Sequence, residues 1–225
     1  MMLKLARSMS FLCVLFALST NLPAGEDCKD GTACKDCTAC EDCKDCPIAK
    51  AMDKLPKLVY TIGDETTVSP VLAGRLARQH KATIKFAVAD KVFDVESEAF
   101  AALVETTEKF VEDFAKCRKC EVSGNTTVAG KEVCCEFAAG ELAALVKKAM
   151  DDVKVTYLVG KESVCCPDAA KALAAKTGAT IVPCLGDQKS GCGSTNRLNI
   201  ARAKYKAAIV AIVATEKKDT AKSDS

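Results

Sequence analysis

Tryptophan is absent from the 225 residues, aromatic side chains make up only 5%, and histidine occurs once, as His80. A single histidine excludes zinc sites of the HExxH type, and any Ser/His or Cys/His dyad would need that one residue. His80 follows Arg78 and Gln79 late in an expected helix, so we interpret it as a surface residue. The chain has 32 basic and 30 acidic residues, and it therefore lacks the basic excess of a nucleic-acid binder. We expect a non-enzymatic protein without a nucleic-acid partner.

The first residues have the features of an export signal. Lys4 and Arg7 supply positive charge, and residues 11–18 (FLCVLFAL) form an apolar stretch too short to span a bilayer. We expect residues 1–24 to be a signal peptide, and the mature chain to be periplasmic or secreted, with no membrane span after cleavage. The alternative is a membrane anchor that stays attached. Disulfide bonds persist in an exported, oxidising setting.

Cysteine, in contrast, is abundant, with 15 residues in the chain. Residues 28–46 read CKDGTACKDCTACEDCKDC, and within this tract a cysteine recurs at every third position: Cys34, Cys37, Cys40, Cys43 and Cys46. A period of three matches polyproline II, in which the five sulfurs would line one edge. Such thiolates can gather a soft cation without a preformed fold. We expect residues 25–54 to be a disordered segment that either binds metal or is a low-complexity linker with randomly oxidised thiols.

An internal duplication dominates the rest of the chain. Residues 60–90 align without gaps onto residues 157–187, an offset of 97, and eleven of the 31 positions are identical. Short apolar runs with Gly-Asp or Gly-Lys turns precede helical patterns, which predicts an α+β fold of tandem strand–strand–helix (ββα) units. The expected order is a two-unit module (55–117), a linking unit (118–152), a duplicate module (153–215) and a disordered tail (216–225).

Two long amphipathic helices are predicted within these units. The helix after Asp94 should bury one apolar face, which comprises Phe100, Leu103, Val104, Thr107, Phe110, Val111 and Phe114. The helix near the end of the chain should bury a similar face, which comprises Leu198, Ala201, Tyr205, Ala208, Ile209 and Ile212.

The cysteines of the globular region fall where a strand gives way to a helix. Cys134-Cys135 and Cys165-Cys166 stand at such junctions, and Cys192 aligns with Val95 at another. The positive end of a helix lowers the pKa of a thiol, so these residues are candidate thiolates. The first module has Val68, Ala87 and Val95 where the second has Cys165, Cys184 and Cys192, which leads us to expect that these three cysteines face inward.

Two segments carry a family resemblance. GKEVCCEFAAGELAAL and GKESVCCPDAAKAL resemble the hairpin-to-helix corner of small TRASH- and YHS-type heavy-metal-associated domains, which are ββα pieces of treble-clef character that bind metal through cysteines. In the linking unit, the resemblance implies Cys120 as the early ligand and Cys134 or Cys135 as the one at the helix start.

The spacing further defines two groups of four thiols. Cys117, Cys120, Cys134 and Cys135 have the spacing of a four-thiolate zinc site, and Cys165, Cys166, Cys184 and Cys192 belong to one module. Each group could instead form disulfide bonds. We therefore expect an exported repeat protein that binds Zn²⁺ or another soft metal ion through thiolates. The alternatives are a disulfide-stapled scaffold for a protein partner and a thiol–disulfide exchange protein.

Overall fold

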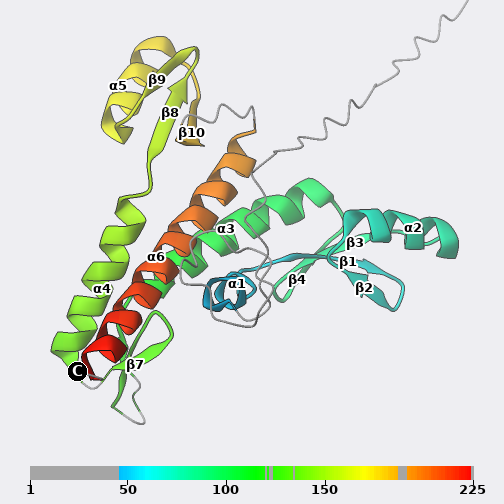
Figure 1. Ribbon diagram of the computed structural model, residues 1–225. Helices are drawn as coiled ribbons and strands as arrows, with labels where there is room; N and C mark the ends of the chain where they lie inside the picture. Colours follow the sequence, from blue (N-terminus) through cyan, green and yellow to red (C-terminus); the bar gives the residue numbers. More distant parts are fainter. Residues whose placement is uncertain (1–45, 120, 122–123, 134, 187–191, 224–225) are drawn as a thin grey trace, which may run out of the picture. The chain divides into compact units, whose positions relative to one another are not determined.

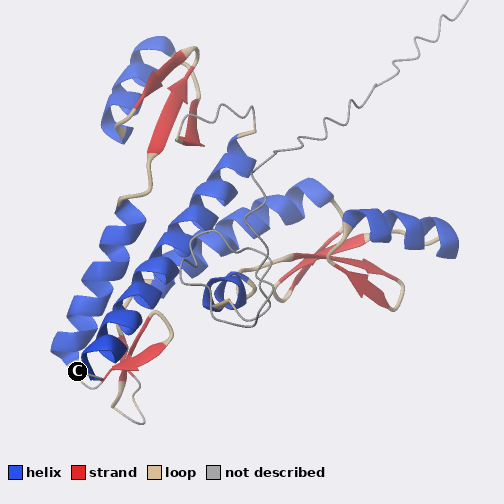
Figure 2. Cartoon of the chain, viewed as in Figure 1, coloured by secondary structure: helices blue, strands red, loops and turns tan. Residues whose placement is uncertain are grey.

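Helices alternate with short antiparallel strands along the chain (Figures 1 and 2). The computed structural model describes residues 46–119, 121, 124–133, 135–186 and 192–223, all within one unit, Cys40–Ser225. The helices are α1 (Pro47–Met52), α2 (Pro70–His80), α3 (Glu96–Phe114), α4 (Glu136–Asp151), α5 (Pro167–Thr177) and α6 (Gly193–Ser223). The α+β class predicted from the sequence is confirmed. The expected signal peptide, residues 1–24, lies outside the described residues.

The strands form three small antiparallel sheets. They are β1 (Leu58–Ile62), β2 (Glu65–Thr67), β3 (Lys85–Val88), β4 (Lys91–Phe93), β5 (Arg118–Lys119), β6 (Thr126–Val128), β7 (Lys131–Val133), β8 (Val155–Val159), β9 (Glu162–Val164) and β10 (Ile181–Leu185). The sheet orders are β2-β1-β3-β4, β5-β6-β7 and β10-β8-β9. The turns that join β1 to β2 and β8 to β9 contain Gly63 and Gly160 at positive φ, where a side chain would be strained.

Element bounds and strand register recur at the 97-residue offset. The strands β8 and β9 and the helix α5 each begin and end 97 residues after β1, β2 and α2 (155 against 58, 162 against 65, 167 against 70). The pair Leu58↔Val88 in the first sheet corresponds to Val155↔Leu185 in the other. Ala73 in α2 and Ala170 in α5, also 97 apart, are both fully buried.

Helix α6 carries the largest part of the core. It packs against α1, α3, α4 and β10, and Figure 1 shows it alongside α3 and α4. The six residues predicted to form its apolar face, from Leu198 to Ile212, are all buried. In α3, Leu103, Val104, Thr107 and Val111 are buried and the three phenylalanines are half-buried. The sequence periodicity of both helices is therefore confirmed.

Tyr205 joins three helices at the centre of this core. Its ring makes edge-to-face contacts with Phe110 and Phe114 of α3, at centroid distances of 5.4 and 4.8 Å. Its hydroxyl donates a hydrogen bond of 3.2 Å to the carbonyl oxygen of Ala51, in α1. Burial raises the pKa of Tyr205, so the hydroxyl remains protonated and able to donate.

The structure corrects the expectation that residues 25–54 are disordered throughout. Residues 47–52 form α1, which packs against α6, and Cys46 and Ile48 are buried. Pro47 at the first helical position and the apolar Ile48 explain the helix and its burial. At the other end, α6 continues to Ser223 where we expect a disordered tail from residue 216, because Lys, Glu and Ala favour helix continuation.

Substitutions of Tyr205 should separate its two contributions to stability. We expect Tyr205→Phe to lower the free energy of unfolding by about 0.5 to 1.5 kcal/mol, because only the hydrogen bond to Ala51 is lost. Tyr205→Ala should cost about 3 to 5 kcal/mol, because the ring contacts also disappear. Urea unfolding followed by circular dichroism measures both. Equal losses for the two variants would contradict a role for the ring.

Candidate functional site

Cysteine stands at the start of four helices. Cys46, Cys135 and Cys166 are the N-cap residues of α1, α4 and α5, and Cys192 directly precedes α6. The predicted placement of Cys135 and Cys166 at strand-to-helix junctions is therefore confirmed, and Cys192 stands, as predicted, at the start of a helix. The two remaining helices, α2 and α3, begin after Ser69 and Val95, which align with Cys166 and Cys192.

Hydrogen bonding at the start of α6 lowers the pKa of the exposed Cys192 thiol. The hydroxyl of Thr195 and the backbone N–H groups of Thr195 and Ser194 donate to its sulfur and hold its pKa below the ordinary value for cysteine. These donors belong to the first turn of α6, whose free N–H groups point toward the sulfur. The lowered pKa of Cys192 favours the thiolate, which is the nucleophilic form.

The thiols of Cys135 and Cys117 both contact α4. The Cys135 sulfur accepts a hydrogen bond of 3.5 Å from the N–H of Ala138, as an N-cap side chain does. The Cys117 thiol, which follows α3, donates to the carbonyl oxygen of Ala139 at 3.7 Å. The first turn of α4 therefore brings together two of the four thiols predicted to form one group. The other two, Cys120 and Cys134, lie outside the described residues, as do Cys34, Cys37, Cys40 and Cys43.

Cys184 is the one thiol of the second group that is buried, with 3% of its surface exposed. Its sulfur accepts a hydrogen bond from the side-chain amide of Asn196 in α6, and its thiol donates to the carbonyl oxygen of Val182, both at 3.6 Å. The expectation that Cys184 faces inward is confirmed.

The same expectation is wrong for Cys165 and Cys192, which are exposed. Their apolar counterparts Val68 and Val95 are themselves 59% and 48% exposed, so alignment with valine did not indicate burial. Val68 and Val95 lie where the chain leaves a strand to begin a helix. Side chains at such a corner point to solvent even where they are apolar.

No disulfide bond joins the seven described cysteines. Within the described ranges, no three or more Cys, His, Asp or Glu side chains are grouped so that they could hold a metal ion. The two predicted four-thiol groups accordingly stay predictions. His80 lies at the surface as expected, with its Nε2 atom 3.2 Å from Oε1 of Glu65.

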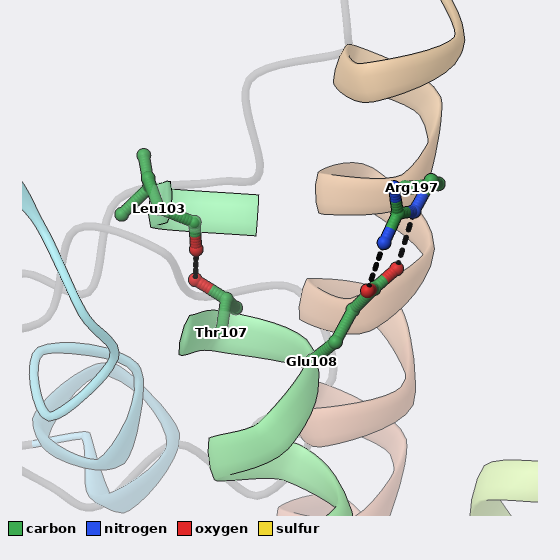
Figure 3. A network of polar contacts seen from close by, with 4 residues as sticks. All are labelled: Leu103, Thr107, Glu108 and Arg197. Carbon is green, nitrogen blue, oxygen red and sulfur yellow. Dashed lines mark hydrogen bonds and ion pairs between the residues drawn. The ribbon is translucent and has the colours of Figure 1, made fainter. Parts of the chain in front are cut away.

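A groove that no sequence motif marks lies between helices. It has a volume of about 620 Å³ and is lined by α3, α4, α6, β8 and β10. Apolar side chains, including Val111, Met150 and Ile200, form part of its lining, beside charges of both signs. Arg197 and Glu108 pair across it through two hydrogen bonds, of 2.9 and 2.5 Å, close to the buried Thr107 (Figure 3).

The chain matches no model of a known protein family, no curated protein and no solved structure. Within the described part of the chain, none of the helices combines the length and apolarity that crossing a membrane requires.

Alkylation kinetics can test the environment of Cys192. We expect iodoacetamide to modify Cys192 faster than Cys184 at neutral pH, because Cys192 is exposed and its lowered pKa provides more thiolate. Thr195→Val removes the hydroxyl donor, so the pKa should rise, the midpoint of the rate–pH profile should move upward and the neutral rate should fall several-fold. Peptide mass spectrometry over a pH series measures the rates.

Ser194→Ala is the matched control for this experiment, since Ser194 contributes through its backbone N–H, which alanine retains. Its profile should coincide with that of the unsubstituted protein. A Thr195→Val profile that also coincides would contradict the assigned role of the Thr195 hydroxyl.

Proposed function

We propose that this chain is an exported, non-enzymatic protein that binds soft metal ions, Zn²⁺ among them, through cysteine thiolates. The observation that carries the proposal is the cysteine at the start of each of α1, α4, α5 and α6. The N-terminus of a helix bears a partial positive charge and free N–H groups, both of which favour the thiolate form. Thiolate is the ligand that soft metals prefer.

The strand-to-helix corners at the starts of α4 and α5 agree with the resemblance to heavy-metal-associated domains. The two resembling segments run through β7 into α4 and through β9 into α5, so each crosses a strand-to-helix corner with a cysteine N-cap. Cys117 and Cys135 both form hydrogen bonds with the first turn of α4. With Cys120 and Cys134, they form the four-thiolate zinc site that we propose for this unit.

The cysteine tract adds further metal-binding thiols to those at the helix starts. Its last member, Cys46, is buried at the start of α1, and α1 is held to α6 through Ala51 and Tyr205. We propose that α1 tethers Cys34, Cys37, Cys40 and Cys43 to the folded part, so that ions collected by the tract remain attached to the protein.

We also propose that the fold arose by duplication of a ββα-repeat module, residues 55–117 and 153–215. The common bounds, strand register and buried alanines at the 97-residue offset support this proposal. Among the differences between the two copies are the thiols at the corners of the second: Cys165 for Val68, Cys166 for Ser69, and Cys192 for Val95.

A scaffold that binds a protein partner is the second candidate, and the groove between α3, α4 and α6 favours it. Its volume of about 620 Å³ lies in the range of binding sites, and its apolar lining beside charges of both signs suits an amphipathic helix. Thiol counts and bound metal in the purified mature protein discriminate between the candidates. Fully oxidised cysteines without metal would favour the scaffold.

The duplication predicts equal sensitivity at equivalent core positions. Ala73→Leu and Ala170→Leu should each destabilise the protein by about 1 to 3 kcal/mol, because both alanines are fully buried where α2 and α5 meet a strand. Ala172→Leu, on the exposed side of α5, is the control and should change stability by less than about 0.5 kcal/mol. Thermal unfolding measures all three. A large cost at only one of the buried positions would argue against equivalent packing.

Metal stoichiometry tests the proposed function. Replacing Cys34, Cys37, Cys40 and Cys43 with Ser should lower the Zn²⁺ bound by the reduced mature protein by about one ion per chain, since a structural zinc takes four ligands. The melting temperature of the apoprotein should change little, because this part of the tract offers few apolar side chains. Elemental analysis after dialysis gives the stoichiometry.

Cys46→Ser provides the contrast, because Cys46 is buried and its replacement should lower the melting temperature. Absence of bound Zn²⁺ and of monovalent copper from the reduced, unsubstituted protein would overturn the proposed function.

A further inference from the structure

Two cysteines of the second module meet at one turn of α6. The Cys184 sulfur, from β10, accepts a hydrogen bond from the amide of Asn196. The Cys192 sulfur accepts from Thr195 and Ser194, and the Cys192 carbonyl oxygen accepts from the N–H of Asn196 at 3.1 Å. Asn196 therefore contacts both cysteines, Cys184 through its side chain and Cys192 through its backbone. Neither cysteine is disulfide-bonded in this structure.

The environments of these two thiols are complementary. Cys192 is exposed and directly precedes α6, so a disulfide in solution can reach its sulfur. Cys184 is 3% exposed, so a dissolved disulfide cannot reach it, although an adjacent sulfur can. Exchange chemistry needs an accessible nucleophilic thiolate and a second thiol that is shielded from the first reaction.

We propose that Cys192 and Cys184 form a dithiol–disulfide exchange pair, in which Cys192 attacks low-molecular-weight disulfides and Cys184 resolves the product. This activity goes beyond metal binding and does not depend on it. It is carried by the two thiols that contact the first turn of α6, one accessible and one buried.

The reaction balances with the disulfide substrate as the only oxidant. The Cys192 thiolate attacks one sulfur of the disulfide RSSR, forms a Cys192–SR bond and releases RS⁻. The Cys184 thiol then loses its proton to solvent, and its sulfur attacks the Cys192 sulfur and releases a second RS⁻. The protein gains a Cys184–Cys192 disulfide and loses two electrons, which reduce RSSR to two thiolates.

The other pair of described cysteines in this module, Cys165 and Cys166, is less suited to resolving a mixed disulfide. Cys165 and Cys166 are adjacent, and the backbone at Cys166 is extended, with φ −121° and ψ 133°. Successive side chains on an extended backbone point to opposite faces. Both are also exposed, so each can react with a separate disulfide molecule.

Peptide mapping provides a direct test. The full mature protein is reduced, freed of metal by a chelator, exposed to glutathione disulfide, quenched by alkylation and digested with trypsin. Cleavage after Lys176, Lys189 and Arg197 places Cys184 and Cys192 in separate peptides, 177–189 and 190–197, each with a single cysteine. We expect these two peptides to be the main cross-linked pair. Absence of this pair would overturn the proposal.

Variants identify the role of each thiol. In Cys184→Ser, and in Cys184→Ala as a second replacement, the glutathione adduct should accumulate on Cys192 at least tenfold above the unsubstituted protein. In Cys192→Ser, the buried Cys184 should remain unmodified. Cys165→Ser is the control and should retain the cross-linked pair. Circular dichroism verifies that each variant is folded.

Equal persistence of the Cys192 adduct with and without Cys184 would show that Cys184 does not resolve it, and would reject the pair. Because metal is removed beforehand, this result leaves the proposed metal binding untouched. Loss of metal binding, in turn, would leave the exchange reaction unaffected.

Discussion

Burial of one face of α6 is the constraint on which the rest of the structure depends. The chain has few aromatic side chains, so its core consists mostly of small aliphatic residues that bury little area individually. Helix α6 compensates by contacting α1, α3, α4 and β10 together. Tyr205 lies at the centre, with its ring against Phe110 and Phe114 and its hydroxyl on the backbone of α1.

The same helix links this core to the thiol chemistry. Its first turn contacts Cys192 and Cys184, while the buried Leu198 and Ala201 begin its packed face within the next turn. The donors around the two sulfurs are consequently fixed by a helix that cannot shift without disturbing the core. Such rigidity favours a stable thiolate environment over one that depends on a mobile loop.

Periodicity made the two long helices predictable, because each buried face repeats within a single element. Cysteine placement at helix starts was equally local and could be read from the order of strand, turn and helix signals. The burial of α1 was not local, since it depends on Tyr205, more than 150 positions farther along the chain. Exposure of Cys165 and Cys192 was also misjudged, because an aligned valine identifies the backbone position and not the depth of its side chain.

The starts of α2 and α5, which lie 97 residues apart, indicate why cysteine occurs where it does. Ser69 caps α2 by accepting a hydrogen bond of 3.4 Å from the N–H of Leu72, and such caps contribute about 0.5 to 2 kcal/mol. Cys166, at the equivalent start of α5, makes no side-chain cap hydrogen bond. The start of α5 therefore lacks a stabilising cap that the start of α2 has. A residue that adds neither a cap nor buried area at this corner contributes little to folding, so the reactivity of its thiol is the property that distinguishes it from serine.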